Sequence, residues 1–286
     1  MSKTTRRAAV LGSPIAHSLS PVLHRAAYAR LGLTDWTYGR YEVDEQSFQG
    51  FLAALERGEL GDPADDEGTW AGLSLTMPLK RVVIPLLDEA DPTALAVNSV
   101  NTLIFRPDGS KYGANTDVPG LAAALRERGV TAVQGAAVLG AGATAGSALA
   151  ALSDMVKGPI TIYVRNPAKL AEFEGLIAHF GIDLDPRPWS EAQGAADFEL
   201  VVNTTPAGAA DALADHLPQR VGTLFDVLYH PWPTALAAAW STRGGAVLGG
   251  QDLLVHQAVR QVELMTGVEG RASEILAAMR EALRED

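Results

Sequence analysis

Two short polar segments near the N-terminus carry side chains suited to acid–base chemistry and to anion binding. Thr76 and Lys80 follow an apolar run that ends at Leu75. Open α/β sheets bind ligands at the carboxyl ends of their strands, where a lysine is able to give or take a proton. Ser18 and Ser20 follow an earlier apolar run. In an extended segment their hydroxyls point to one side, which makes a plausible cradle for a carboxylate.

Each of these residues also has an ordinary structural interpretation. Ser20 precedes Pro21, a common N-cap arrangement, so for Ser20 taken alone the capping role is the favoured interpretation. A single lysine is most often a surface cation. Asp117 precedes an expected helix at Val118 and is likewise suited to cap it. Residue type alone therefore leaves both interpretations open.

A glycine-rich turn lies in the middle of the chain. Residues 136–145 read AAVLGAGATA, a strand pattern followed by G-x-G-x-x-A and by a helix of small residues. Gly140 permits the turn, Gly142 lets the backbone approach a pyrophosphate, and the helix N-terminus offers N–H donors. The pattern predicts a dinucleotide site. The alternative is the same tight turn without a ligand.

The residues after the next expected strand, 160–164, indicate which dinucleotide. An NAD enzyme places an acidic residue there to accept from the ribose 2′-OH. This chain has Arg165 and Asn166, with Lys169 one turn further on. Cations suit a 2′-phosphate, so the prediction is NADP(H). The alternative is two solvated cations on a surface turn.

The elements that must position these residues form two alternating series. Strand patterns at 8–12, 38–43 and 70–75 alternate with a helix at 22–31 and a second helix capped by Asp44, which predicts βαβαβ and a mostly parallel sheet. A hairpin is expected over 100–113, around Pro107-Asp108-Gly109. After a helix at 118–128, further strands are expected at 136–140, 160–164, 198–203, 223–227 and 246–248, with helical segments such as 167–179 and 233–242 and two tail helices within 252–284.

Composition excludes several classes of function. The 286 residues carry 23 basic and 34 acidic side chains, a net charge of −11, which disfavours nucleic acid and anionic membranes. The absence of cysteine excludes disulfides and thiolate chemistry. The uncharged stretch 135–152 is read as a buried strand, turn and helix, and no export signal is seen, so a cytoplasmic protein is expected. The acidic segment 58–68 misses the calcium-loop spacing, and the six histidines show no metal-site spacing.

The order of these motifs resembles the shikimate dehydrogenase family over nearly the whole chain. The matching segments are GSPIAHSLSPVLH (12–24), LSLTMPLK (73–80), SVNTL (99–103), GANTD (113–117), VLGAGATAGSA (138–148), NTTPAG (203–208), DVLYHPWPT (226–234) and GGQDLLVHQA (249–258). The resemblance implies an α/β protein: a substrate-binding catalytic domain from 1–116 and 252–286, a Rossmann-like NADP-binding domain from 117–251, and a cleft between them.

The resemblance also implies the reaction and its residues. The reaction is the reversible NADPH-dependent reduction of 3-dehydroshikimate to shikimate, with no metal, by a monomer or homodimer. Lys80 and Asp117 match the catalytic pair. The implied substrate ligands are Ser18, Ser20, Thr76, Asn101, Tyr229 and Gln257. The implied cofactor contacts are Gly140, Ala141, Gly142, Ala143, Thr144, Arg165, Asn166, Lys169, Asn203, Thr204, Val227 and Gly250.

Two departures from the family pattern leave alternatives open. Ser74 stands where the family usually has Asn, which puts one ring-hydroxyl contact in doubt. Asn166 stands where many members have Thr, which puts one phosphate contact in doubt. The nearest rival is a quinate/shikimate dehydrogenase that prefers NAD. A rival from another class is a non-catalytic shikimate-binding relative.

Overall fold

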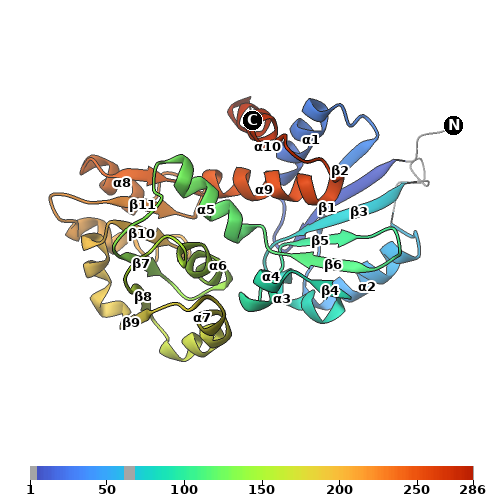
Figure 1. The fold of residues 1–286 in the computed structure, drawn as a ribbon. Coiled ribbons are helices and arrows are strands. Elements are labelled where there is room, and N and C mark those ends of the chain that lie inside the picture. The colour runs from blue at the N-terminus through green and yellow to red at the C-terminus, as the bar shows by residue number, and fades with distance from the viewer. Residues whose placement is uncertain (1–4, 61–67, 286) are drawn as a thin grey trace. The chain divides into compact units, whose positions relative to one another are not determined.

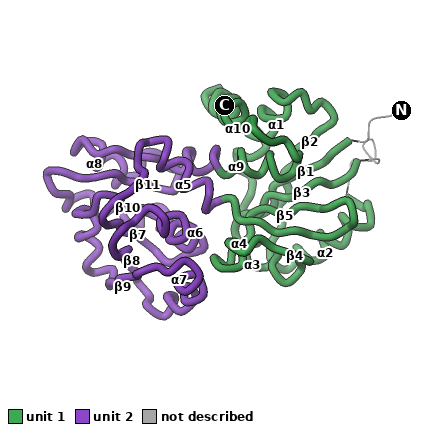
Figure 2. Tube along the Cα trace, viewed as in Figure 1, with its two compact units in different colours: residues 1–116, 257–286 green, residues 117–256 purple. Residues whose placement is uncertain are grey.

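The computed structural model describes residues 5–60 and 68–285, so the acidic residues Asp62, Asp65, Asp66 and Glu67 lie outside the described residues. The chain divides into two compact units (Figure 2). Unit 1 comprises residues 1–116 and 257–286, and unit 2 comprises residues 117–256. The second boundary lies inside a single helix, α9 (Gly250–Thr266).

Unit 1 contains a mixed sheet in the order β2-β1-β3-β5-β6-β4 (Figure 1). Its elements are β1 (Arg6–Gly12), α1 (Ser20–Leu31), β2 (Trp36–Glu42), α2 (Glu45–Glu56), β3 (Thr69–Leu75), α3 (Leu79–Val82), η1 (Ile84–Leu86), β4 (Glu89–Ala90), α4 (Pro92–Ala96), β5 (Thr102–Phe105), β6 (Lys111–Ala114) and α10 (Ala272–Glu285). β1 pairs in parallel with β2 and β3, which confirms the predicted βαβαβ arrangement.

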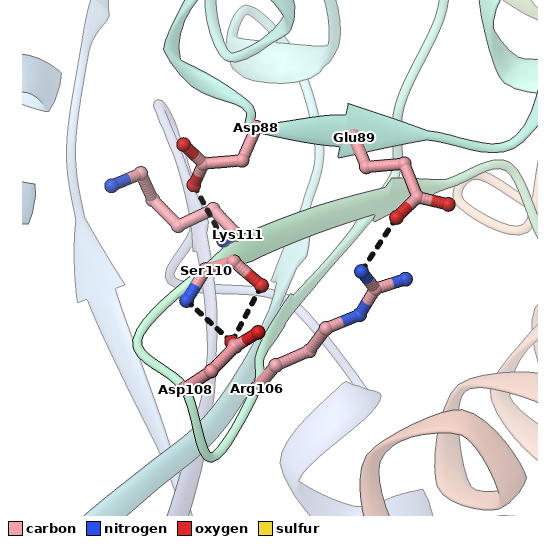
Figure 3. Close-up of polar contacts among 6 residues, drawn as sticks. All are labelled: Asp88, Glu89, Arg106, Asp108, Ser110 and Lys111. Atoms are coloured by element: carbon pink, nitrogen blue, oxygen red, sulfur yellow. Dashed lines mark hydrogen bonds and ion pairs between the residues drawn. The ribbon is translucent and has the colours of Figure 1, made fainter.

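The predicted hairpin is confirmed as the antiparallel pair β5–β6. Its first strand, β5, also pairs antiparallel with β3. Its turn is built by Asp108, whose carboxylate accepts from the Ser110 backbone N–H at 2.9 Å and from the Ser110 hydroxyl at 2.7 Å (Figure 3). Arg106 bonds Glu89 at 2.6 Å, which ties the hairpin to the short edge strand β4 (Figure 3). The two-residue β4 was not predicted, because so short a strand has no periodicity to detect.

The starts of the first two helices differ in how they are capped. Asp44 forms the expected cap of α2, where its carboxylate accepts from the Ser47 N–H at 2.8 Å and the Ser47 hydroxyl closes a capping box. The predicted capping role of Ser20 is wrong. Ser20 is the first residue of α1, and the N-cap is Leu19, which makes no side-chain cap hydrogen bond. The Ser20 hydroxyl therefore does not cap α1 and instead interacts with Tyr38.

Unit 2 contains a parallel sheet in the order β12-β11-β10-β7-β8-β9, as a Rossmann-like arrangement requires. Its elements are α5 (Asp117–Glu127), β7 (Ala136–Leu139), α6 (Ala143–Leu152), β8 (Ile160–Val164), η2 (Pro167–Phe173), α7 (Glu174–Phe180), β9 (Leu184–Pro188), η3 (Trp189–Asp197), β10 (Leu200–Asn203), η4 (Asp211–His216), β11 (Thr223–Asp226), α8 (Ala235–Thr242) and β12 (Ala246–Leu248).

One strand of this sheet was not predicted, and one predicted helix differs from the structure. β9 contains Pro186 and Pro188, which lack the N–H of a ladder donor and are tolerated only because β9 is an edge strand. The segment predicted as a helix over 167–179 is a 3-10 helix to Phe173 and an α-helix only from Glu174. Periodicity alone does not separate these two kinds of helix.

Each unit encloses its own apolar core. In unit 1, Phe48 and Leu52 of α2 belong to one buried apolar cluster with the sheet residues Leu11 and Leu73. The helix that follows the glycine turn, α6, is almost wholly buried, so small residues there let it lie close to the sheet. Within residues 5–60 and 68–285, no helix is both long and apolar enough to cross a bilayer.

Candidate active site

The carboxyl ends of β1 and β3 bring two of the predicted polar segments together in unit 1. β1 and β3 are neighbours, with Leu11 opposite Leu75. The loops that follow them are joined by a hydrogen bond of 3.0 Å from the Ser13 N–H to the Met77 carbonyl. A Cβ at Gly12 would lie 2.4 Å from the Thr76 side chain, so this close approach requires glycine. The Ser18 loop and the Thr76–Lys80 segment therefore share one edge of the sheet.

A third polar segment joins the same edge. The Val100 N–H donates to the Lys80 carbonyl at 2.8 Å, and the Leu75 N–H donates to the Asn101 carbonyl at 2.8 Å. Lys80 is half-buried, at the second position of α3. These bonds place the backbones that carry Thr76, Lys80 and Asn101 side by side.

The local geometry of the two serines differs from the expected extended segment. Leu19 between them has helical dihedrals, and the Ser20 N–H donates to the Ser18 hydroxyl at 3.4 Å. Ser18 is half-buried and Ser20 is buried. Arg40 reaches across from β2 and donates to the carbonyls of Ala16 and Ser18, which holds the loop. The two hydroxyls lie at the start of a helix, as predicted. They lie on a turn, however, and not on an extended segment.

Asn101 and Gln257, far apart in sequence, belong to one buried network. The Asn101 amide nitrogen donates to the Thr116 hydroxyl at 3.0 Å and to Gln257 Oε1 at 3.5 Å. The Thr116 hydroxyl also contacts Gln257 Oε1 at 3.4 Å. The part of α9 around Gln257 thus lies beside the segments around residues 101 and 116. Two of the predicted substrate ligands, Asn101 and Gln257, are therefore neighbours.

A second layer of buried polar residues lies against this network and was missed as a functional feature. Gln261, one turn beyond Gln257 on α9, contacts His24 at 3.3 Å and Ser74 at 2.8 Å. His24 also stacks on Tyr38 with ring centroids 3.9 Å apart. The i,i+4 spacing of Gln257 and Gln261 was the available signal, because it places both amides on the same helix face.

His24 is fully buried and neutral. Burial lowers the pKa of His24 from about 6.5 to about 3, against a smaller raising effect of the hydrogen bond to Gln261. In the unfolded chain the imidazole regains its ordinary pKa. Between these two pH values the unfolded state binds a proton that the folded state does not, so the free energy of unfolding falls as pH falls from 6.5 towards 3.

We therefore expect the protein to lose about 2 kcal/mol of stability through His24 alone between pH 7 and pH 5. His24→Gln keeps an N–H donor for Gln261 without a titrating ring. Denaturant unfolding of both proteins at the two pH values measures the difference. A parent and variant with the same pH dependence would show that His24 is not the responsible group.

The remaining predicted residues of the first site lie on separate elements. Thr76 is half-buried, and its carbonyl accepts from the Leu79 N–H at 2.8 Å, which turns the chain into α3. Asp117 is 5% exposed and is the first residue of α5, at the start of unit 2. Tyr229 of unit 2 is 38% exposed, unusually open for a large aromatic side chain.

In unit 2 the glycine turn has the geometry that a phosphate site needs. Gly140 has φ +101°, and a Cβ there would lie 2.9 Å from the Thr204 hydroxyl. Gly142 is the exposed N-cap of α6, and the space where its Cβ would be is open. Ala143 and Thr144 open the helix behind it, so N–H groups of Gly142, Ala143 and Thr144 are available to an approaching anion.

The cationic residues after β8 are accessible. Arg165 and Lys169 are exposed, and within the described part of the chain their side chains make no hydrogen bond or ion pair. The side-chain oxygen of Asn166 has a structural role: it caps η2 by accepting from the Ala168 N–H at 3.1 Å. Arg165 and Lys169 are thus suited to an anion that the chain itself does not supply.

The other predicted cofactor positions line the ends of β10 and β11. Thr204 Oγ1 donates to the Leu139 carbonyl at 2.7 Å, which ties this residue to the glycine turn. Asn203 is buried, and the Val227 N–H donates to its carbonyl at 3.0 Å. A Cβ at Gly250 would lie 2.3 Å from the Val227 carbonyl, so only glycine permits α9 to start there. Four of the predicted positions therefore adjoin one another through backbone contacts.

Comparison with known proteins decides the family. A family model described as the shikimate dehydrogenase substrate binding domain matches residues 10–103. A curated relative from Acidiphilium cryptum, Shikimate dehydrogenase (NADP(+)), is 35% identical over 91% of this chain and 90% of its own length. The chain belongs to the shikimate dehydrogenase family. The resemblance inferred from the eight sequence segments is thereby confirmed.

Solved structures agree with this assignment. The shikimate dehydrogenase of Mycobacterium tuberculosis is 38% identical, with a TM-score of 0.83 over 96% of this chain and 99% of that one. The Thermus thermophilus shikimate 5-dehydrogenase, solved in complex with NADP(H) and shikimate, is 29% identical, with a TM-score of 0.79 over 97% of this chain and 100% of that one. The α/β fold class with a Rossmann-like sheet is confirmed.

Proposed function

We propose that this member of the shikimate dehydrogenase family catalyses the NADPH-dependent, reversible reduction of 3-dehydroshikimate to shikimate. The observation that carries the proposal is the set of polar side chains gathered at one edge of the unit 1 sheet, in a chain that also has a glycine turn with two accessible cations. The substrate-binding domain would comprise residues 1–116 and 252–286, and the NADP-binding domain residues 117–251.

The substrate would be held by hydroxyl and amide groups. Ser18 and Ser20 stand at the start of α1, where the helix dipole favours a carboxylate. Asn101 and Gln257 offer amide groups from one network, which suits ring hydroxyls or the carboxylate. The remaining proposed ligands of the ring are Thr76 and Tyr229.

The proton would be handled by Lys80 and Asp117. NADPH, when bound, supplies the hydride that reduces the ketone. As negative charge develops on the carbonyl oxygen, the Lys80 ammonium would stabilise it and donate a proton there. The Asp117 carboxylate would orient this ammonium. In the oxidative direction the neutral amine of Lys80, the form left after that proton transfer, would accept the hydroxyl proton of shikimate.

NADP fits unit 2 on the chemistry of the groups present. Gly140 to Thr144 would bind the pyrophosphate, and Arg165 and Lys169 the 2′-phosphate. Asn166 would contribute near that phosphate, although its oxygen already caps η2. Asn203, Thr204, Val227 and Gly250 would complete the cofactor site. A cytoplasmic location, small-molecule partners only and a monomer or homodimer are part of the same proposal.

The experiment is to follow nicotinamide absorbance when the purified protein meets shikimate with NADP, shikimate with NAD, and quinate with each cofactor. We expect shikimate with NADP to give the highest kcat/KM. The highest value with NAD and quinate would make the protein a quinate-type enzyme. Shikimate binding without turnover by any pair would make it a non-catalytic relative.

Ser18→Ala and Ser20→Ala should each raise the KM for shikimate about tenfold or more, because each removes a hydrogen bond to a charged group. Ser13→Ala is the matched control, since Ser13 lies in the same loop but its hydroxyl donates to Glu42 at 3.1 Å. An analogue without the carboxylate should be bound equally weakly by parent and variants. Normal shikimate affinity in the two variants would rule out the carboxylate cradle.

A further inference from the structure

Gln261 has a buried side chain, and both polar atoms of its amide form hydrogen bonds. It is 1% exposed. Its Oε1 accepts from the Ser74 hydroxyl at 2.8 Å and from His24 Nε2 at 3.3 Å. Its Nε2 donates to the Asn101 carbonyl at 3.1 Å and to the Thr102 hydroxyl at 3.1 Å. The Asn101 carbonyl is able only to accept, so the Gln261 amide has one orientation. A flipped Gln261 amide would place its own oxygen against the Asn101 carbonyl oxygen.

Through these bonds Gln261 holds both the backbone and the side chain of Asn101. The Thr102 hydroxyl, having accepted from Gln261, donates to Asn101 Oδ1 at 2.9 Å. The Thr116 N–H donates to the same oxygen at 2.8 Å. Because Oδ1 is held by these donors, the Asn101 amide nitrogen is turned towards Thr116 Oγ1 and Gln257 Oε1. Asn101 therefore keeps its amide nitrogen on the side of Gln257, the other proposed substrate ligand in this network.

Ser74, at the position where the family usually has Asn, belongs to this supporting layer. It is 3% exposed. Its single hydroxyl hydrogen is donated to Gln261, and its oxygen accepts from the Tyr38 hydroxyl at 2.6 Å. Burial raises the pKa of Tyr38, which keeps that phenol protonated and able to donate. The hydroxyl of Ser74 is thus occupied within the protein and is not offered to a ring hydroxyl.

We propose that Gln261 is a positioning residue for substrate recognition, and that Ser74 acts through Gln261 rather than by contact with the substrate. The unit formed by Ser74, Gln261 and Thr102 sets which way the Asn101 amide faces, with its nitrogen towards Gln257, the neighbouring proposed ligand. This inference rests on the proposed function, because it takes Asn101 to be a ligand of shikimate.

The test is Gln261→Met, which keeps the length of the side chain and removes all four hydrogen bonds. We expect the KM and the calorimetric Kd for shikimate to rise about tenfold, as for the loss of one well-placed hydrogen bond. The kcat and the KM for NADP should stay within about threefold, because the reacting groups and unit 2 are unchanged. Ser74→Ala should raise the same two constants by a smaller factor.

Two controls separate positioning from loss of stability. Leu52→Ala, in the core of the same unit, should lower the melting temperature without changing shikimate affinity. The double variant Ser74→Ala with Gln261→Met should bind shikimate no more weakly than Gln261→Met alone, because Ser74 acts through the residue already removed.

The outcomes distinguish this inference from the proposed function. Parent-like shikimate Kd in folded Gln261→Met would overturn the inference while leaving the activity standing. Multiplicative effects of the two substitutions would overturn the role given to Ser74. A shift in Kd that Leu52→Ala reproduces at equal loss of melting temperature would reduce Gln261 to a structural residue. If the parent neither binds nor oxidises shikimate, the proposed function itself fails.

Discussion

Lys80→Ala is expected to lower kcat by about 100-fold or more and to leave the KM for shikimate within a few-fold. The reason is that the ammonium meets full charge on the substrate oxygen only in the transition state, so its loss raises the barrier more than it weakens ground-state binding. Steady-state kinetics with shikimate and NADP measure both constants. Lys80 is half-buried in α3, and its carbonyl accepts from the Val100 N–H at 2.8 Å.

Arg81→Ala is the matched control for this substitution. Arg81 is the next residue of the same short helix, α3. The substitution Arg81→Ala therefore removes one positive charge at nearly the same place. If kcat depends on the general field of the protein, both variants should lose activity to a similar extent. If Lys80 acts on the substrate, Arg81→Ala should remain close to the parent. Near-normal kcat in Lys80→Ala would remove that lysine from the mechanism.

Arg165→Ala is expected to lower kcat/KM for NADP by roughly 10- to 200-fold and to leave kcat/KM for NAD unchanged. Arg165 is able to form paired, charge-assisted hydrogen bonds to a 2′-phosphate, worth about 1.5 to 3 kcal/mol, and NAD has no group to accept them. The parent should prefer NADP by a similar factor. Because Arg165 and Lys169 are exposed, added salt should weaken NADP more than NAD.

Arg187→Ala provides the control for charge alone. Arg187 lies on the neighbouring strand β9 of the same sheet, but its guanidinium is paired with Asp185 at 3.0 Å. Its removal should lower the use of NADP only slightly. Equal use of both cofactors by the parent would defeat the assignment to Arg165 and would favour the NAD-preferring, quinate-type alternative.

The sequence predicted the elements whose signals are local. Alternating apolar runs gave β1, β2 and β3, the Pro107-Asp108-Gly109 turn gave the hairpin, and Asp44 gave the start of α2. The geometry around Ser18 and Ser20 was not predictable in the same way. The helical turn at Leu19 depends on how the loop packs, including the contact from Arg40, and no neighbouring residue encodes it.

By itself the sequence determined the class of fold, the family, the glycine turn and the cations that follow β8, because each depends on residues close together in the chain. Only the tertiary structure decided that Ser74 is turned inward, and that Gln261 holds Asn101 from a helix about 160 positions away in sequence. A buried hydrogen bond forms where folding brings a donor to an acceptor, whatever their separation along the chain. Residue type shows that a serine or a glutamine is able to bond, and packing selects the partner.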